Sequence, residues 1–284
     1  MPDPSLFLPL VLQSAVVPFC VALAVMFALR RALSGVAPAA ALAAAFIAAY
    51  FAVFHAQWSL VPHTALDWMP HIALFGMAGA LAAESAPGAA ARVFARLVMV
   101  LVAATVIVWP ALASLGAAKA VLVTGIAAVL VTGAWSWLAQ ASISRPTPAP
   151  LLMVTAGGSA LVLMLDASAA LGQATGALAS ALAACVLFNL PRARAAFSPA
   201  ASGVAVLLLG TLLLNAWLYA GLSAGYVALL AGGLLSDPLV ATANRMRGRS
   251  GGAGSWITAS VLTALPVLAT VAFAVKTMQE SGGY

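Results

Sequence analysis

Long apolar stretches alternate with short polar breaks along almost the whole chain, and this pattern predicts ten membrane-spanning helices. A run of about 18 or more apolar residues is long enough to cross the hydrocarbon core of a bilayer as a helix. The runs are continuous rather than alternating, which favours helices over a β-barrel. The predicted spans are approximately Leu6–Leu29, Pro38–Trp58, Trp68–Ser85, Val93–Leu115, Lys119–Leu138, Leu151–Leu165, Ala169–Leu190, Ala200–Ala220, Ser223–Val240 and Trp256–Val275.

Two segments decide the exact number of spans. Residues 151–190 form one apolar block that is too long for a single helix, so we expect a hairpin whose tip lies between Asp166 and Ala169. Asp166 is the expected cap of the second helix of that hairpin. The segment Ser223–Val240 is short and rich in glycine, so a re-entrant or broken segment is the alternative there, and the chain would then have eight or nine full spans.

Composition leads to the same class of protein. Hydrophobic residues make up 64% of the 284 residues, only 6% are charged, and the mean hydropathy is +1.11. A soluble domain of this size could not cover its surface with so few charges. We therefore expect an all-α, polytopic membrane helix bundle that forms a single domain over residues 1–284, with a weak internal repeat between residues 38–115 and 200–275.

Basic residues fall in or beside every second break, which predicts the orientation of the bundle. The residues that follow the first, third, fifth, seventh and ninth predicted spans are Arg30, Arg31, Arg92, Arg96, Arg145, Arg192, Arg194, Arg245, Arg247 and Arg249. Lys119 is the main exception to the pattern. Because Lys and Arg stay on the cytoplasmic side of a membrane, both termini should face outward. We expect a multi-pass protein of the bacterial cytoplasmic (inner) membrane.

The same distribution of charge bears on the partners of the protein. The net charge of +6 is spread over short loops and forms no continuous patch, which excludes a nucleic-acid partner. The expected surroundings are the lipid bilayer, together with other membrane proteins or further copies of this chain.

All three histidines lie within 17 residues, between the second and third predicted spans. His55, His63 and His71 occur there with Asp67, and the four-residue spacing of Asp67 and His71 places both on one helix face. Three interpretations stay open. The cluster is an ordinary interfacial rim with Asp67 as a cap, or a divalent metal site with these four residues as ligands, or a histidine pair that holds haem or titrates near neutral pH.

Polar groups inside the predicted spans are few and uncharged. The candidates for lining a substrate path are Asn215, Ser159 and the adjacent Gly157 and Gly158. No predicted span carries a charged residue near its middle, which argues against a proton- or sodium-driven carrier. The sequence contains no nucleophile motif, phosphate loop or cysteine ligand set, so we predict no catalytic residues.

Two functional hypotheses follow. The first is a permease or channel-like transporter for a small neutral solute or a metal ion, motivated by the number of spans and by Pro18 and Pro266 inside them. The second is a non-transporting membrane subunit or scaffold of a larger complex, motivated by the apolar middle of the bundle and its short loops. A polar cavity open to one side would favour transport, whereas a solid core with an exposed apolar groove would favour the scaffold.

Overall fold

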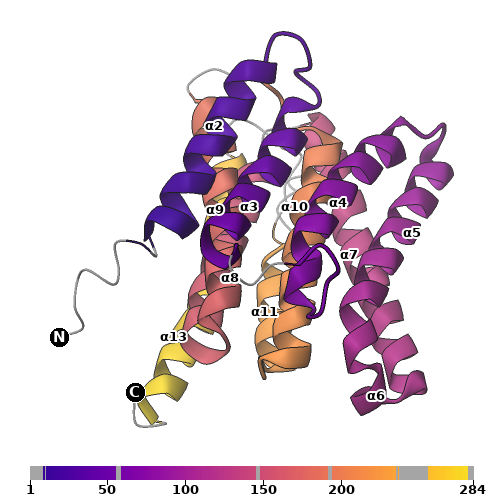
Figure 1. The fold of residues 1–284 in the computed structure, drawn as a ribbon. Coiled ribbons are helices and arrows are strands. Elements are labelled where there is room, and N and C mark those ends of the chain that lie inside the picture. Colours follow the sequence, from indigo (N-terminus) through magenta and orange to yellow (C-terminus); the bar gives the residue numbers. More distant parts are fainter. Residues whose placement is uncertain are drawn as a thin grey trace, which may run out of the picture.

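The computed structural model describes residues 9, 11–55, 59–144, 148–190, 194–234, 236 and 255–280, which form a bundle of helices (Figure 1). The elements in chain order are η1 (Leu12–Val16), α2 (Val17–Leu29), α3 (Ala37–Phe54), η2 (Leu66–Trp68), α4 (Met69–Ser85), α5 (Ala89–Val108), η3 (Trp109–Ala111), α6 (Leu112–Leu115), α7 (Ala117–Ser144), α8 (Pro148–Asp166), α9 (Ala169–Phe188), α10 (Pro199–Tyr219), α11 (Ala224–Gly233) and α13 (Ser255–Glu280). This described part of the chain contains no strand.

Eight helical segments within the described residues are long and apolar enough to cross a membrane. They are Leu12–Leu29, Ala37–Phe54, Ala89–Leu115, Ala117–Ser142, Pro148–Asp166, Ala169–Phe188, Pro199–Tyr219 and Ser260–Glu280. The expectation of an all-α, multi-pass membrane bundle is thereby confirmed, but the count of ten is not. Helix α4 has 17 residues, and α11 has only 10. The end of the predicted span Ser223–Val240 lies outside the described residues.

Every predicted apolar run nevertheless contains a helix, and the hairpin of residues 151–190 is present. Helix α8 ends at Asp166 and α9 begins at Ala169, as the pattern predicts. The predicted cap is wrong, because Ser168 rather than Asp166 occupies the N-cap position of α9. Two residues separate the helices, so they run antiparallel and form the most extensive helix pair of the bundle.

Prolines mark the starts of four helices. Pro38, Pro70, Pro148 and Pro199 each lie in the first turn of α3, α4, α8 and α10. The first turn suits proline because its missing N–H would have no intrahelical partner there. Pro18 lies inside the continuous helical segment Leu12–Leu29, as predicted, where the π-helical turn η1 runs directly into α2. Pro266 likewise lies inside α13 as predicted.

Helix α10 forms the centre of the bundle. It contacts α3, α4, α5, α7, α8, α9 and α11, and 78% of its most apolar window is buried. The peripheral helix α7 has only 22% of its window buried. Large apolar side chains such as Phe94, Val121 and Leu130 are exposed on α5 and α7. A soluble protein could not present such faces over whole helices, but lipid solvates them.

The connections alternate between the two ends of the bundle. Figure 1 shows the α2–α3 and α4–α5 connections at its upper end, which we call the arginine end, and α6 at its lower end, which we call the α6 end. Arg30 and Arg31 lie in the α2–α3 connection, and Arg92 lies in the first turn of α5. Lys119, in the first turn of α7, is at the α6 end. This clustering of arginines at one end follows from the alternation seen in the sequence.

Candidate functional site

A cavity of about 310 Å³ lies at the α6 end, where four separate parts of the chain meet. Its walls come from the loop before α4, from η3, from the α8–α9 turn with the start of α9, and from the end of α10. The lining residues are Thr64, Ala65, Leu66, Pro110, Ser168, Ala170, Leu171, Asn215, Tyr219 and Ala220. None of these residues carries a charge at neutral pH, so the cavity is uncharged and mainly apolar.

Asn215 is the buried amide of this cavity. It lies one turn before Tyr219, the last residue of α10, and is thus about 6 Å along the axis from the end of the helix. The residue is only 4% exposed, and its Nδ2 atom is buried with no hydrogen-bond partner among the described residues. The Tyr219 hydroxyl donates to the Ile107 carbonyl oxygen at 2.8 Å, which fastens the end of α10 to the end of α5 beside the cavity.

The amino-terminal end of α9 forms the opposite wall. Ser168 is at the N-cap of this helix, but its side chain makes no capping hydrogen bond. Ala170 and Leu171, in the first turn, also line the cavity. The first N–H groups of an α-helix have no partner within the helix and carry the positive end of its dipole. The cavity therefore lies between the start of α9 on one side and the end of α10 on the other.

Asp67, predicted as a metal ligand, stabilises the loop before α4 through hydrogen bonds of its carboxylate. Its Oδ2 atom accepts from the backbone N–H groups of His63 at 3.1 Å and Thr64 at 2.9 Å, and its Oδ1 atom accepts from the Tyr50 hydroxyl at 3.3 Å. Burial by itself would raise the pKa of Asp67, but these hydrogen bonds outweigh it and hold the pKa below its ordinary value. The carboxylate thus stays ionised and fixes the loop that forms one cavity wall.

The three histidines surround this loop without forming a ligand set with Asp67. His55 is at the end of α3 and is exposed, as is His63 in the loop. His71 is half-buried, and its Nδ1 atom lies 3.3 Å from the backbone oxygen of Asp67. No group of three His, Cys, Asp or Glu side chains among the described residues could hold a metal ion. The metal and haem hypotheses remain predictions, and the geometry supports a structural role for Asp67.

The four predicted path residues are in different surroundings. Asn215 lines the cavity, whereas Ser159, Gly157 and Gly158 are not among its lining residues. Ser159 is fully buried in α8, and its hydroxyl has no hydrogen-bond partner in the part of the chain that the structure describes. Gly158 allows α13 to approach α8, because a Cβ at this position would overlap the Val267 side chain. Of these four residues, Asn215 is therefore the one that lines this cavity.

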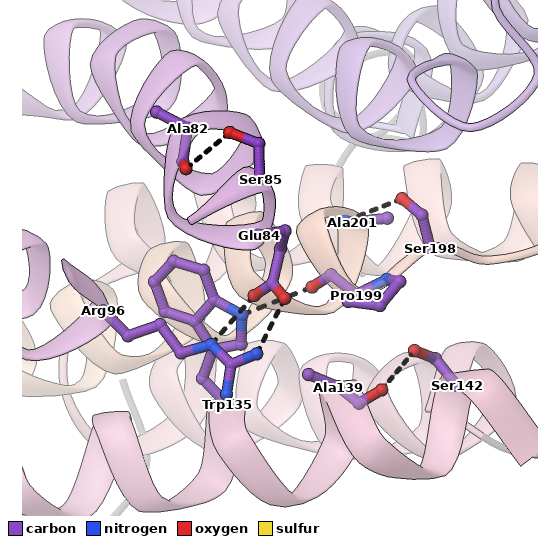
Figure 2. Close-up of polar contacts among 10 residues, drawn as sticks. All are labelled: Ala82, Glu84, Ser85, Arg96, Trp135, Ala139, Ser142, Ser198, Pro199 and Ala201. Atoms are coloured by element: carbon purple, nitrogen blue, oxygen red, sulfur yellow. Dashed lines mark hydrogen bonds and ion pairs between the residues drawn. The ribbon is translucent and has the colours of Figure 1, made fainter. Parts of the chain in front are cut away.

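The arginine end contains a buried ion pair that the sequence pattern did not identify (Figure 2). Arg96 Nε and Nη2 donate to the two carboxylate oxygens of Glu84 at 2.8 and 2.7 Å. The Arg96 guanidinium lies 5.7 Å from the centre of the Trp135 ring, and Trp135 Nε1 donates to the Pro199 carbonyl oxygen at 3.3 Å. Trp135 is fully buried against Gly203, where a Cβ would overlap the indole. These contacts join α4, α5, α7 and α10.

The sequence pattern counts Arg96 among the basic residues beside a break, because it lies close to the start of the predicted span Val93–Leu115. Helix α5 begins at Ala89, so Arg96 lies about two turns inside the helix. The available signal was an acidic and a basic residue, Glu84 and Arg96, on either side of the Pro87–Gly88 break. An antiparallel pair of helices around so short a break brings such residues together.

Comparison with known proteins gives no relative from which a function could be inferred. No protein-family model matches the chain, and no significant match is found among curated proteins or solved structures. The fold defines the class alone: an all-α, multi-pass membrane protein.

Proposed function

We propose that this protein is a permease or channel-like transporter for a small neutral solute, which enters the bundle through the cavity beside Asn215. The observation that carries the proposal is this cavity, which is partly polar and uncharged and lies at one end of a bundle of apolar helices. Ligand sites in helix bundles commonly occur between helices, in concave and mainly apolar volumes with a few polar groups.

The packing at the other end of the bundle is what we expect of a gated pathway. The central helix α10 connects the two ends, since Asn215 lies near its last turn and Gly203 lies in its second turn against Trp135. The Glu84–Arg96 pair and Trp135 are packed between α4, α5, α7 and α10 at the arginine end. A gated pathway needs packed contacts of this kind at the end opposite its opening.

The helix interruptions beside the cavity also favour a solute site. Helix α5 passes into the 3-10 turn η3 at Trp109, and Pro110 of this turn lines the cavity. Helix α10 ends at Tyr219, and Gly221 then adopts a φ of 75° before α11 begins. Irregular backbone at membrane depth is tolerated where it is buried in protein or faces a polar volume.

We further propose that the arginine end faces the cytoplasm of a bacterium. Arg30, Arg31 and Arg92 lie at this end, and Arg194 lies in the connection that leads into α10. The positive-inside preference then places the Asn215 cavity on the outer side. The bilayer is the partner of the exposed apolar faces, and association with further copies or with other membrane proteins remains a prediction.

Solute flux into liposomes tests the proposal. Vesicles that contain the purified protein should swell in glycerol, urea or butyramide faster than protein-free vesicles in stopped-flow light scattering. Ala170→Phe should bring the rate close to that of protein-free vesicles, because Ala170 lines the cavity and a phenyl ring would fill much of its volume. Ala169→Phe is the matched control, because Ala169 is the preceding residue, is exposed and does not line the cavity.

The same assay separates the alternative function. If the wild-type protein gives no flux above protein-free vesicles for any of these solutes, transport of small neutral solutes is refuted. The non-transporting subunit then becomes the better hypothesis, to be followed by identification of membrane proteins that remain bound after mild solubilisation.

A further inference from the structure

We propose that the ends of α2 and α9 at the arginine end form a binding site for an anionic phospholipid. The phosphate of the lipid binds the arginines that follow these two helices, and its acyl chains lie along exposed apolar side chains of the same helices. This surface is separate from the Asn215 cavity, so the lipid site does not depend on the transport proposal.

Helices α2 and α9 are neighbours that end on the same side of the bundle. They pack against each other, and the Ser180 hydroxyl of α9 donates to the carbonyl oxygen of Ser14 in η1, directly before α2, at 3.4 Å. Helix α2 runs toward the α2–α3 connection at the arginine end (Figure 1). Helix α9 begins beside the cavity at the α6 end and therefore also runs toward the arginine end. The residues that follow the two helices are thus brought to one region of the surface.

The arginines that follow these helices are held in place by aromatic rings and by the backbone. Arg30 is the C-cap of α2, and its guanidinium carbon lies 3.9 Å from the centre of the Phe27 ring. The backbone N–H of Arg194 donates to Asn189 Oδ1 at 2.9 Å, and its guanidinium carbon lies 5.9 Å from the centre of the Phe188 ring. A guanidinium that contacts a ring through its face keeps its in-plane N–H groups for another acceptor. Phosphate oxygens match these groups in a bidentate arrangement.

These cations have no counter-charge from the protein. Arg30, Arg31 and Arg194 form no ion pair in the part of the chain that the structure describes. Glu84 lies on α4 at the same end, but both of its carboxylate oxygens accept from Arg96. A phosphodiester beside α2 and α9 would therefore provide the negative charge that these arginines lack, and basic residues near membrane-spanning helices bind anionic lipid headgroups in this way.

Exposed apolar side chains beside the arginines favour a lipid over a free phosphate ion. Phe27 and Leu187 are exposed in the last turns of α2 and α9, and Leu190 is exposed directly after α9. A phosphate ion would contact the arginines alone. A phospholipid also covers these side chains with its acyl chains, so one ligand satisfies both the cations and the apolar surface.

Titration of lipid into the purified protein in detergent, followed by native mass spectrometry, tests the inference. The probes are palmitoyl-oleoyl phosphatidylglycerol and palmitoyl-oleoyl phosphatidylcholine, which have the same acyl chains and differ in net charge. The wild type should bind the first phosphatidylglycerol molecule at least about tenfold more tightly than phosphatidylcholine. Arg30→Gln and Arg194→Gln should each weaken phosphatidylglycerol binding about fivefold, the factor expected for one arginine beside an anionic lipid.

Arg92→Gln is the matched control. It removes the same charge from the same end of the bundle, but Arg92 lies on α5, whose main neighbours are α4, α7 and α10. This variant should keep the phosphatidylglycerol affinity of the wild type. The melting temperatures of all three variants without added lipid should equal that of the wild type, because none of these arginines forms an ion pair with the described protein.

Three results would overturn the inference. Equal affinity of the wild type for the two lipids would exclude recognition of the anionic headgroup. A loss in Arg92→Gln as large as in Arg30→Gln and Arg194→Gln would show attraction by the charge of the whole end instead of a site at α2 and α9. Binding of glycerol 3-phosphate, which carries the phosphate without acyl chains, as tightly as phosphatidylglycerol would exclude a lipid as the specific ligand.

Discussion

Replacing Glu84 by glutamine should destabilise the protein strongly, because it leaves the Arg96 guanidinium buried without its counter-charge. The side chains of Arg96 and Glu84 are only 8% and 15% exposed, and two short hydrogen bonds join them. Removing one partner of a buried ion pair typically costs about 3–5 kcal/mol. Partial access to solvent at Glu84 favours the lower part of this range, so we expect about 3 kcal/mol. The free energy of unfolding can be measured by SDS titration in mixed micelles, followed by tryptophan fluorescence.

The chain contains a matched control for this experiment. Lys276 and Glu280 also form an ion pair, with 3.6 Å between Nζ and Oε1, but their side chains are 70% and 67% exposed. Glu280→Gln should change the free energy of unfolding by about 0.5 kcal/mol or less. The double replacement Glu84→Leu with Arg96→Met should recover most of the stability lost in Glu84→Gln, because it removes both charges. A loss in Glu84→Gln as small as that in Glu280→Gln would refute the argument that burial makes this pair important.

Three further outcomes follow from the structure. Gly203→Ala should destabilise the protein by about 1–3 kcal/mol because its Cβ would overlap the Trp135 indole. Gly133→Ala is the control, because a Cβ there meets no atom within 4 Å, and it should be neutral or slightly stabilising in the same SDS titration. Asp67→Asn should lower the melting temperature at pH 7. Because the folded pKa of Asp67 is depressed, its stabilisation is present above the ordinary value of 3.8 and is lost as the pH falls through the lower folded pKa, so the difference in melting temperature between wild type and variant should shrink as the pH is lowered below 3.8. A reporter fused after Arg194 should be active only in the cytoplasm, and periplasmic activity there would contradict the proposed orientation.

The sequence alone determined the class of the protein and most of its helices. Apolar runs report directly on spans, because a helix in lipid must satisfy its backbone within the segment and cover itself with apolar side chains. The same local logic located the break between α8 and α9. It was less accurate at helix ends, where the first turn can include polar residues. Helix α5 begins at Ala89, four residues before the predicted start at Val93, because Gly88 with a φ of 80° ends the preceding turn.

The candidate site and the ion pair were decided by tertiary structure. Asn215 was a candidate from its polarity alone, but the cavity that it lines also needs Leu66, Pro110 and Ser168, and no local pattern relates these distant segments. The histidine cluster shows the converse case. The closeness of the histidines and Asp67 in the sequence suggested that they bind one metal ion. In the folded loop, however, the Asp67 carboxylate accepts hydrogen bonds from backbone N–H groups. Hydropathy is a property of single segments, and it therefore predicts spans; cavities and buried pairs depend on which helices become neighbours, and only packing decides that.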